Sequence, residues 1–140
     1  MSTIRSPELG PYRRGQLASI PCSEPDPFPD WAAITERDAH DMRSIYMDGL
    51  PIAAFGYVPL TRHEVDAFAV IDRRSSRGVG AQVAKLIYKQ MIDWMRHLGV
   101  TRVNASCSAN ERVAQVFLRA AGFKKVRTTA DTAHFTFIWR

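Results

Sequence analysis

A segment rich in arginine and glycine, residues 70–81, has the residue types of an anion-binding loop. It contains three arginines and two glycines: Arg73, Arg74, Arg77, Gly78 and Gly80. An apolar, strand-like run precedes it and a helical pattern follows it. The first amides of a helix lack intrahelical acceptors and lie at the positive end of its dipole, and glycine lets a phosphate approach them closely. The segment therefore predicts a pyrophosphate-binding cradle; the alternative is a plain turn, which glycines also serve.

Cysteine and histidine, by contrast, predict no metal or redox site. Cys22 and Cys107 lie 85 positions apart and match no zinc or redox spacing, so two free thiols are expected. The four histidines show no metal-ligand spacing, and no metal is expected. Cys107 has no histidine and acid beside it in the sequence, which disfavours a role as nucleophile.

The elements that would position the cradle follow from periodicity. The segment Gly78–Leu98 has apolar residues at helical spacing: Val79, Val83, Leu86, Ile87, Met91, Trp94, Met95 and Leu98. Gly99 follows at the position where a left-handed residue ends a helix. Before the cradle, His63–Ile71 is predicted to be a strand. Its last residues are apolar on both faces, which predicts a place in the interior of the sheet.

The first half of the chain predicts an arm, a short helix and a hairpin. Six of the eight prolines lie in residues 1–30, which predicts an extended arm or loop, with a strand possible at Ser2–Arg5. Asp30 is a candidate N-cap for a helix that begins near Trp31. Two predicted strands flank the Asp-Gly pair at residues 48 and 49, a hairpin signal: Ser44–Met47 and Pro51–Val58.

The last third of the chain predicts one more helix among three strands. The expected strands are Val103–Cys107, Phe123–Val126 and His134–Trp139. Ser108 and Glu111 match a capping box. The helix that it opens should end at Gly122 and bury Val113, Val116, Phe117 and Ala120. The order of meander, helix, strand, helix and strand pair predicts a mixed α/β fold in a single domain, residues 1–140.

Composition and charge narrow the function classes. The chain has 140 residues, 46% hydrophobic and 24% charged, as in ordinary globular proteins. No apolar run is long enough for a transmembrane helix, and the first residues show no secretory signal. Residues 1–66 hold ten acidic and six basic residues, a net charge of −4, whereas residues 67–140 hold four and thirteen, a net charge of +9. A basic second half indicates a polyanionic partner, either a nucleic acid or a phosphate-rich cofactor; the alternative is an unevenly charged solvated surface.

Two motifs together resemble the GNAT superfamily of N-acyltransferases. The sequence Arg-Gly-Val-Gly at residues 77–80, after a strand, is similar to the family's acyl-CoA-binding motif. The helix end Ala-x-x-Phe-Leu-x-x-x-Gly-Phe at residues 114–123 is similar to its second signature. The order of elements from about residue 42 onward matches as well. The resemblance implies the GNAT fold, an antiparallel meander followed by helix, strand, helix and strand pair, and acetyl-CoA as co-substrate.

Site residues can be carried over from the resemblance by position. It implies a cradle from Ser75 to Ala81, with the amides of Arg77 to Ala81 holding the pyrophosphate. It also implies that the backbone of Phe68 to Val70 pairs with the pantetheine arm. The arm would enter where the strands at His63–Ile71 and Arg102–Cys107 diverge. The implied cofactor-binding residues are Phe68, Val70, Ser75, Arg77, Gly78, Val79, Gly80, Ala81 and Asn110.

Two positions depart from the family pattern, and the second of them makes a general base the more important catalytic group to find. Ser75 stands where the family has Gln or Arg, and Leu118 where it often has the tyrosine that protonates the leaving thiolate. A thiol pKa near 8.5 makes the thiolate a tolerable leaving group, whereas an amine with a pKa of about 10.4 must first lose a proton. Glu64 and Asp66 share one face of a predicted strand and are the candidate catalytic bases. The alternative is that both are charges at the rim of a strand end.

Two functions from different classes remain open at this point. The first is an acetyl-CoA-dependent N-acetyltransferase acting on an unidentified amine by direct transfer; a net negative first half would suit a cationic acceptor. The second is a catalytically lapsed GNAT-like assembly protein, because the segments at residues 44–56 and 116–123 resemble phage-encoded GNAT-like proteins, a group that includes an internal virion protein of podophages. A cytoplasmic place is expected, or the virion or host cytoplasm in the phage case, and a homodimer or a virion partner is left open. Nucleic-acid binding is not favoured, since no basic stripe alternates with aromatics.

Overall fold

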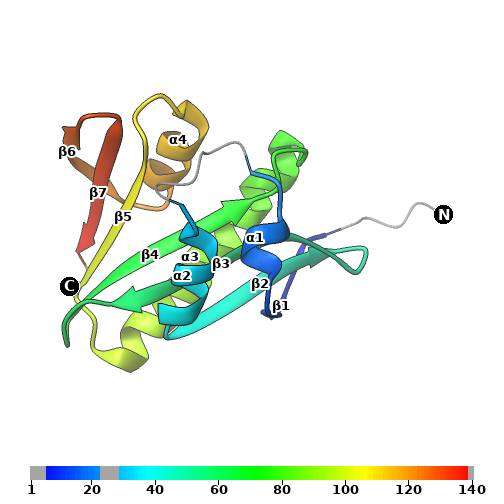
Figure 1. The fold of residues 1–140 in the computed structure, drawn as a ribbon, viewed down its shortest axis with the longest axis horizontal. Helices are drawn as coiled ribbons and strands as arrows, with labels where there is room; N and C mark the ends of the chain where they lie inside the picture. The colour runs from blue at the N-terminus through cyan, green and yellow to red at the C-terminus, as the bar shows by residue number, and fades with distance from the viewer. Residues whose placement is uncertain (1–5, 23–28, 139–140) are drawn as a thin grey trace.

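A computed structural model describes residues 6–22 and 29–138 of the chain. One seven-stranded sheet has the strand order β1-β2-β3-β4-β5-β7-β6 (Figure 1). Its strands are β1 (Glu8–Pro11), β2 (Asp41–Met47), β3 (Leu50–Pro59), β4 (Glu64–Ile71), β5 (Arg102–Ser108), β6 (Lys124–Thr129) and β7 (Thr132–Ile138). The helices are α1 (Gln16–Ser19), α2 (Trp31–Asp38), α3 (Arg77–Leu98) and α4 (Arg112–Ala120). The predicted mixed α/β fold is confirmed.

The sheet is antiparallel except at its centre. Strands β1 to β4 pair antiparallel with their neighbours, as do β5, β7 and β6, and β4 pairs parallel with β5. The turn between β2 and β3 has positive φ at both Asp48 and Gly49, the conformation that a two-residue hairpin turn needs. The hairpin predicted from this Asp-Gly pair is therefore confirmed, and β4 lies in the interior of the sheet as expected.

Helix α3 follows the predicted pattern closely. Ser76 is its N-cap, and Gly99 ends it with a φ of 70°. The side chains of Val83, Ile87 and Met95 are buried against the sheet. Trp94 lies about two turns beyond Ile87 on the same side, and the centroid of its ring is 5.6 Å from that of Phe55 on β3. This apolar contact fixes the direction in which α3 leaves the end of β4.

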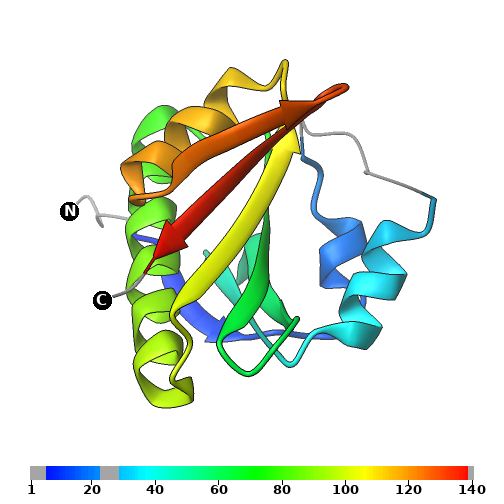
Figure 2. The same ribbon diagram turned by 90° about the vertical axis from the view of Figure 1, so that its left-hand side faces the viewer.

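Helices cover the two faces of the sheet in different places, as Figure 2 shows. On one face, α3 and α4 cover two apolar clusters that contain Phe55, Val103 and Phe135. On the other face, α1 and α2 pack over a third cluster that includes Val70 and the partly buried Phe68. Alternate residues of β4 therefore point toward different helix layers. No helix in the described ranges is both long enough and apolar enough to span a bilayer.

Helix α4 differs from its prediction in both its start and its buried face. Ser108 belongs to β5, where it pairs with Thr132, so the N-cap is Glu111 and the predicted capping box is wrong. Val113 and Val116 are 75% and 65% exposed, contrary to expectation. Ala120 is exposed as well, whereas Phe117 contacts the core as predicted, together with Ala114 and Leu118. Ser108 is part of the strand ladder, so the helix begins later than predicted, at Arg112. The side of the helix that contacts the core is shifted by about one residue from the predicted side.

The N-terminal region also differs in detail. Asp30 is the N-cap of α2, as expected, but its side chain makes no capping hydrogen bond and its φ is 60°. The first strand, β1, was not predicted; the strand expected at Ser2–Arg5 lies outside the described residues, as do residues 23–28 of the proline-rich arm. Tyr12 donates a hydrogen bond to Glu36, which ties the segment between β1 and α1 to α2. Burial, followed by this bond, raises the pKa of Tyr12 to about 12.

Candidate active site

The two central strands diverge soon after they meet. Strands β4 and β5 pair over three residue pairs, from Glu64 with Arg102 to Asp66 with Asn104. Beyond Asp66, β4 continues to Ile71 along β3, and β5 continues to Ser108 along β7. Figure 1 shows the two strands separating from a shared end. Among the described residues, the divergence leaves main-chain groups of β4 that face away from β3 without a strand partner. The resemblance implied that the pantetheine arm would enter here.

The start of α3 lies at the far end of β4 and is open. Ser76 Oγ accepts a hydrogen bond from the amide of Val79 at 3.3 Å, and its carbonyl accepts one from Gly80 at 2.9 Å. Helix geometry then leaves the amides of Arg77 and Gly78 without an intrahelical acceptor. A β-carbon on Gly78 or Gly80 would meet no described atom within 4 Å. The space that a phosphate would need beside this helix terminus is therefore free, so these residues fit the predicted group.

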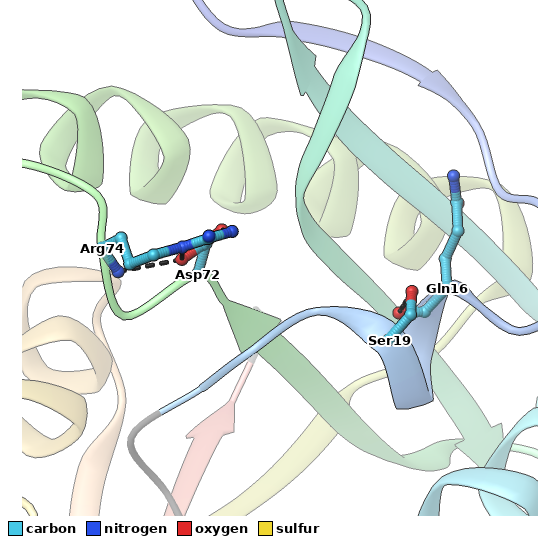
Figure 3. Close-up of polar contacts among 4 residues, drawn as sticks. All are labelled: Gln16, Ser19, Asp72 and Arg74. Atoms are coloured by element: carbon cyan, nitrogen blue, oxygen red, sulfur yellow. Dashed lines mark hydrogen bonds and ion pairs between the residues drawn. The ribbon is translucent and has the colours of Figure 1, made fainter.

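The three arginines of this segment do not have equal surroundings. Arg74 donates to both carboxylate oxygens of Asp72, at 3.0 and 2.7 Å, and its amide donates to the same group at 2.9 Å (Figure 3). The guanidinium of Arg74 lowers the pKa of Asp72 by this hydrogen bonding. Arg73 and Arg77 have exposed side chains. The pair of Asp72 and Arg74 shapes the loop, and the other two arginines are the cations available to an anion.

The loop before α3 is anchored to the N-terminal arm. The amide of Arg73 donates to the carbonyl of Pro21 at 2.8 Å, and that of Asp72 donates to Ile52 on β3 at 2.8 Å. Ser75, the first residue of the predicted cradle, is half-buried, and its amide donates to the carbonyl of Asp72. These main-chain bonds hold the loop in place before any ligand binds.

The two candidate bases lie on the face of β4 opposite α3. Glu64 Oε2 accepts a hydrogen bond from Asn104 Nδ2 at 2.6 Å. Asn104 Oδ1 in turn accepts one from the hydroxyl of Thr136 at 3.0 Å. The pKa of Asp66 is raised, first by burial and then by the charge of Glu64. The Asp66 side chain is nonetheless in contact with solvent, so a substrate can reach a carboxylate with enhanced proton affinity.

The remaining predicted residues lie around this site. Val70 is buried, and half-buried Phe68 packs edge-on against Trp31 of α2 with ring centroids 6.2 Å apart. Asn110 is exposed in the loop after β5. Because β4 and β5 run parallel, this loop and the cradle lie at the same edge of the sheet. Leu118 packs against the core beneath α4 and has no proton to donate.

Sequence reasoning missed Asn104 and Thr136. The signal for Asn104 was present, because asparagine is disfavoured in strands and here interrupts the run from Val103 to Cys107. Thr136 gave no such signal, since threonine is common in strands. Its link to Glu64 depends on the register of β5 with β7, which pairs Asn104 with Thr136.

The described residues also contain a large open recess, of about 910 Å³, at the opposite side of the sheet. It lies beside β1 and the turn between β2 and β3, and its lining includes Glu8, Gln16 and Tyr46. Strands β2 and β3 separate it from β4. None of the candidate site residues lines it.

Comparison with solved structures identifies the fold. No protein-family model matches the chain, and no curated protein sequence matches it. Among solved structures, the Campylobacter jejuni N-acetyltransferase PseH in complex with acetyl coenzyme A is similar, with 12% identity, 77% of this chain and 74% of that chain covered, and a TM-score of 0.59. A GNAT-family acetyltransferase from Streptococcus pneumoniae has 14% identity, coverages of 79% and 75%, and a TM-score of 0.63. The GNAT domain of S. lividans PAT has 18% identity, coverages of 76% and 68%, and a TM-score of 0.63. The chain therefore has the fold of the GNAT acetyltransferases.

Proposed function

We propose that the protein is an N-acetyltransferase that takes the acetyl group of acetyl-CoA and passes it directly to an amine. The observation that carries this proposal is the divergence of β4 from β5 beside the open start of α3. One structural neighbour, PseH, was solved with acetyl coenzyme A, as was yncA from Salmonella typhimurium. A shared fold and an open cradle support the same donor here.

The donor's phosphates would meet the amides of Arg77 and Gly78 and the cations of Arg73 and Arg77. The rest of the proposed cradle is formed by Ser75, Val79, Gly80 and Ala81, and Asn110 approaches from the next loop. The main chain of Phe68 and Val70 would pair with the pantetheine arm as an added strand. This arrangement would leave the thioester near the point where β4 and β5 separate.

Glu64 and Asp66 supply the negative charge that a cationic amine needs at this point. An ammonium group must lose a proton before its nitrogen can attack a carbonyl, and a carboxylate with a raised pKa accepts that proton more readily. Leu118 cannot protonate the departing thiolate, and a thiol pKa near 8.5 makes this loss tolerable near neutral pH. The acceptor is therefore an amine that is positively charged in solution.

Thermal melting with acetyl-CoA, combined with an assay for free thiol, tests this proposal. Acetyl-CoA at about 100 times its dissociation constant should stabilise the fold by about 2.7 kcal/mol, which is visible as a higher Tm. Polyamines, lysine peptides and aminoglycosides should be screened for thiol release. No melting shift would contradict the proposal. A shift without release by any amine would favour the other possibility, a GNAT-like assembly protein that has lost catalysis, including the virion-associated role that the resemblance suggested.

A further inference from the structure

A chain of side-chain hydrogen bonds crosses three strands on the face that carries the two carboxylates. Thr136 on β7 donates to Asn104 Oδ1 at 3.0 Å, and Asn104 Nδ2 donates to Glu64 Oε2 at 2.6 Å. An ionised carboxylate can only accept, so the amide nitrogen of Asn104 must face Glu64. The hydroxyl of Thr136 then satisfies the other end of the amide and fixes its orientation.

This chain fixes Glu64 at a set distance from Asp66. The two carboxylates are two residues apart on one face of β4, a separation of about 7 Å along the strand. Without Asn104, the Glu64 side chain could turn toward solvent or toward Arg102, its partner in register on β5. The hydrogen bond to Asn104 keeps the negative charge beside Asp66 instead.

The surroundings of Asp66 make Glu64 its main electrostatic neighbour. In register with Asp66 stand Val58 on β3 and Asn104 on β5, neither of which is charged. On this face of the sheet, the titratable side chains nearest in register are Arg102 on β5, opposite Glu64, and His134 on β7, opposite Ser106. Tyr57 of β3 lies on the other face, against Trp94 of α3. Burial raises the pKa of Asp66 most, and the charge of Glu64 raises it further.

We propose that Asn104, held in turn by Thr136, is a positioning residue that fixes the Glu64 carboxylate beside Asp66, and that Asp66 rather than Glu64 accepts the proton of the amine substrate. The inference rests on the proposed function and divides its two candidate bases into separate roles. Glu64 is a negative charge held in place through its Oε2 atom, which accepts the hydrogen bond from Asn104. Asp66 is open to solvent. Each unit by which its pKa rises makes the equilibrium constant for proton transfer from the ammonium group ten times larger.

The protons balance in this scheme. The substrate ammonium gives one proton to the Asp66 carboxylate and becomes a neutral amine. Its nitrogen forms a bond to the thioester carbon, the carbon–sulfur bond breaks, and the nitrogen's surplus proton goes to the departing thiolate to give the free thiol. Asp66 then releases its proton to water, so one proton is produced for each acetyl group transferred.

Titration of the Asp66 carboxyl carbon by NMR in the free protein tests the positioning role without any need for activity. Glu64→Gln and Asn104→Ala should both lower the pKa of Asp66, the first by removing the charge and the second by releasing it. Thr136→Val should lower it less, and Asn104→Gln, which keeps an amide, should restore part of it. Ser106→Ala, the next residue on the same face of β5, is the matched control and should change nothing. An unchanged Asp66 titration in Asn104→Ala or Thr136→Val, beside a clear change in Glu64→Gln, would overturn the positioning role.

Steady-state kinetics test the division of roles. Asp66→Asn should lower kcat by roughly 100-fold or more, as expected for loss of a general base, with the KM for acetyl-CoA unchanged. Glu64→Gln and Asn104→Ala should lower kcat less and move the acidic limb of the pH profile to lower pH. A larger loss in Glu64→Gln than in Asp66→Asn would reverse the assignment. If no amine is acetylated by the unaltered protein, the proposed function and the catalytic role of Asp66 fail together, and the NMR titration still decides whether Asn104 positions Glu64.

Discussion

Glycine at position 80 lowers the stability of the helix in which it lies. It lies in the first turn and a half of a 22-residue helix, has no positive φ that would require glycine, and leaves open space where a β-carbon would be. Glycine inside a helix costs up to about 1 kcal/mol relative to alanine. Nothing in the described fold needs a glycine here, whereas a phosphate lying against the amides would.

Exchange of Gly80 should therefore have opposite effects on stability and binding. Gly80→Ala is expected to raise the free energy of unfolding by up to about 1 kcal/mol and to weaken acetyl-CoA binding, because the new methyl group occupies the phosphate's space. Gly80→Val should weaken binding further. Urea unfolding and calorimetric titration measure the two effects, with Gln82→Ala, exposed on the same helix, as control. Unchanged affinity in both Gly80 variants would remove this residue from the site.

Helix α4 was predicted correctly as a helix, but the side predicted to face the core was wrong. The start of α4 was predicted at Ser108, and its apolar residues form a stripe so broad that more than one side could face the core. Strand β5 instead keeps Ser108 in the ladder, and the helix buries the side that carries Ala114 and Leu118. Local pattern could predict the helix, but it could not decide which side of the broad apolar stripe packs against the sheet.

The face of α4 can be tested by matched substitutions. Val116→Ser should change the free energy of unfolding by less than about 0.5 kcal/mol, because the side chain is 65% exposed. Leu118→Ala should cost about 1–3 kcal/mol, since it removes methyl groups that pack against the core. Urea denaturation measures both. Equal losses at the two positions would mean that the helix is rotated toward the orientation expected from the sequence.

At the scale of the whole molecule, the sequence predicted those features that depend on local pattern. Helix α3 was predictable because its apolar period and its final Gly99 are local, and the hairpin was predictable because Asp48 and Gly49 are adjacent. The cradle stays a prediction, and it could be made because its glycines and arginines are contiguous. The link from Thr136 through Asn104 to Glu64 was not, because it depends on two strand registers that span most of the chain. The proline-rich arm gave no period from which β1 could be predicted.

The outer edges of the sheet have a further consequence for the protein's behaviour at high concentration. Strands β1 and β6 are the edges, and open edges can add strands from other copies. Strand β1 ends at Pro11, which has no amide hydrogen to donate. All six residues of β6 are exposed, two of them are Lys124 and Lys125, and its register shifts before Arg127. Both edges therefore carry features that oppose edge-to-edge growth.

Replacement of the β6 lysines should make the protein self-associate without loosening its fold. Lys124→Val with Lys125→Val would turn the first three residues of β6 into a run of β-branched apolar side chains, which promotes strand addition. Static light scattering should rise at a lower protein concentration than for the unaltered chain, with Tm nearly unchanged. Lys85→Val with Lys89→Val, exposed on α3, removes the same charge away from any edge. If the control variant with both α3 lysines replaced aggregates at the same concentration, net charge and not strand β6 sets the colloidal stability. If it stays monomeric, the two lysines on one edge strand are what keep the open sheet from growing into fibrils.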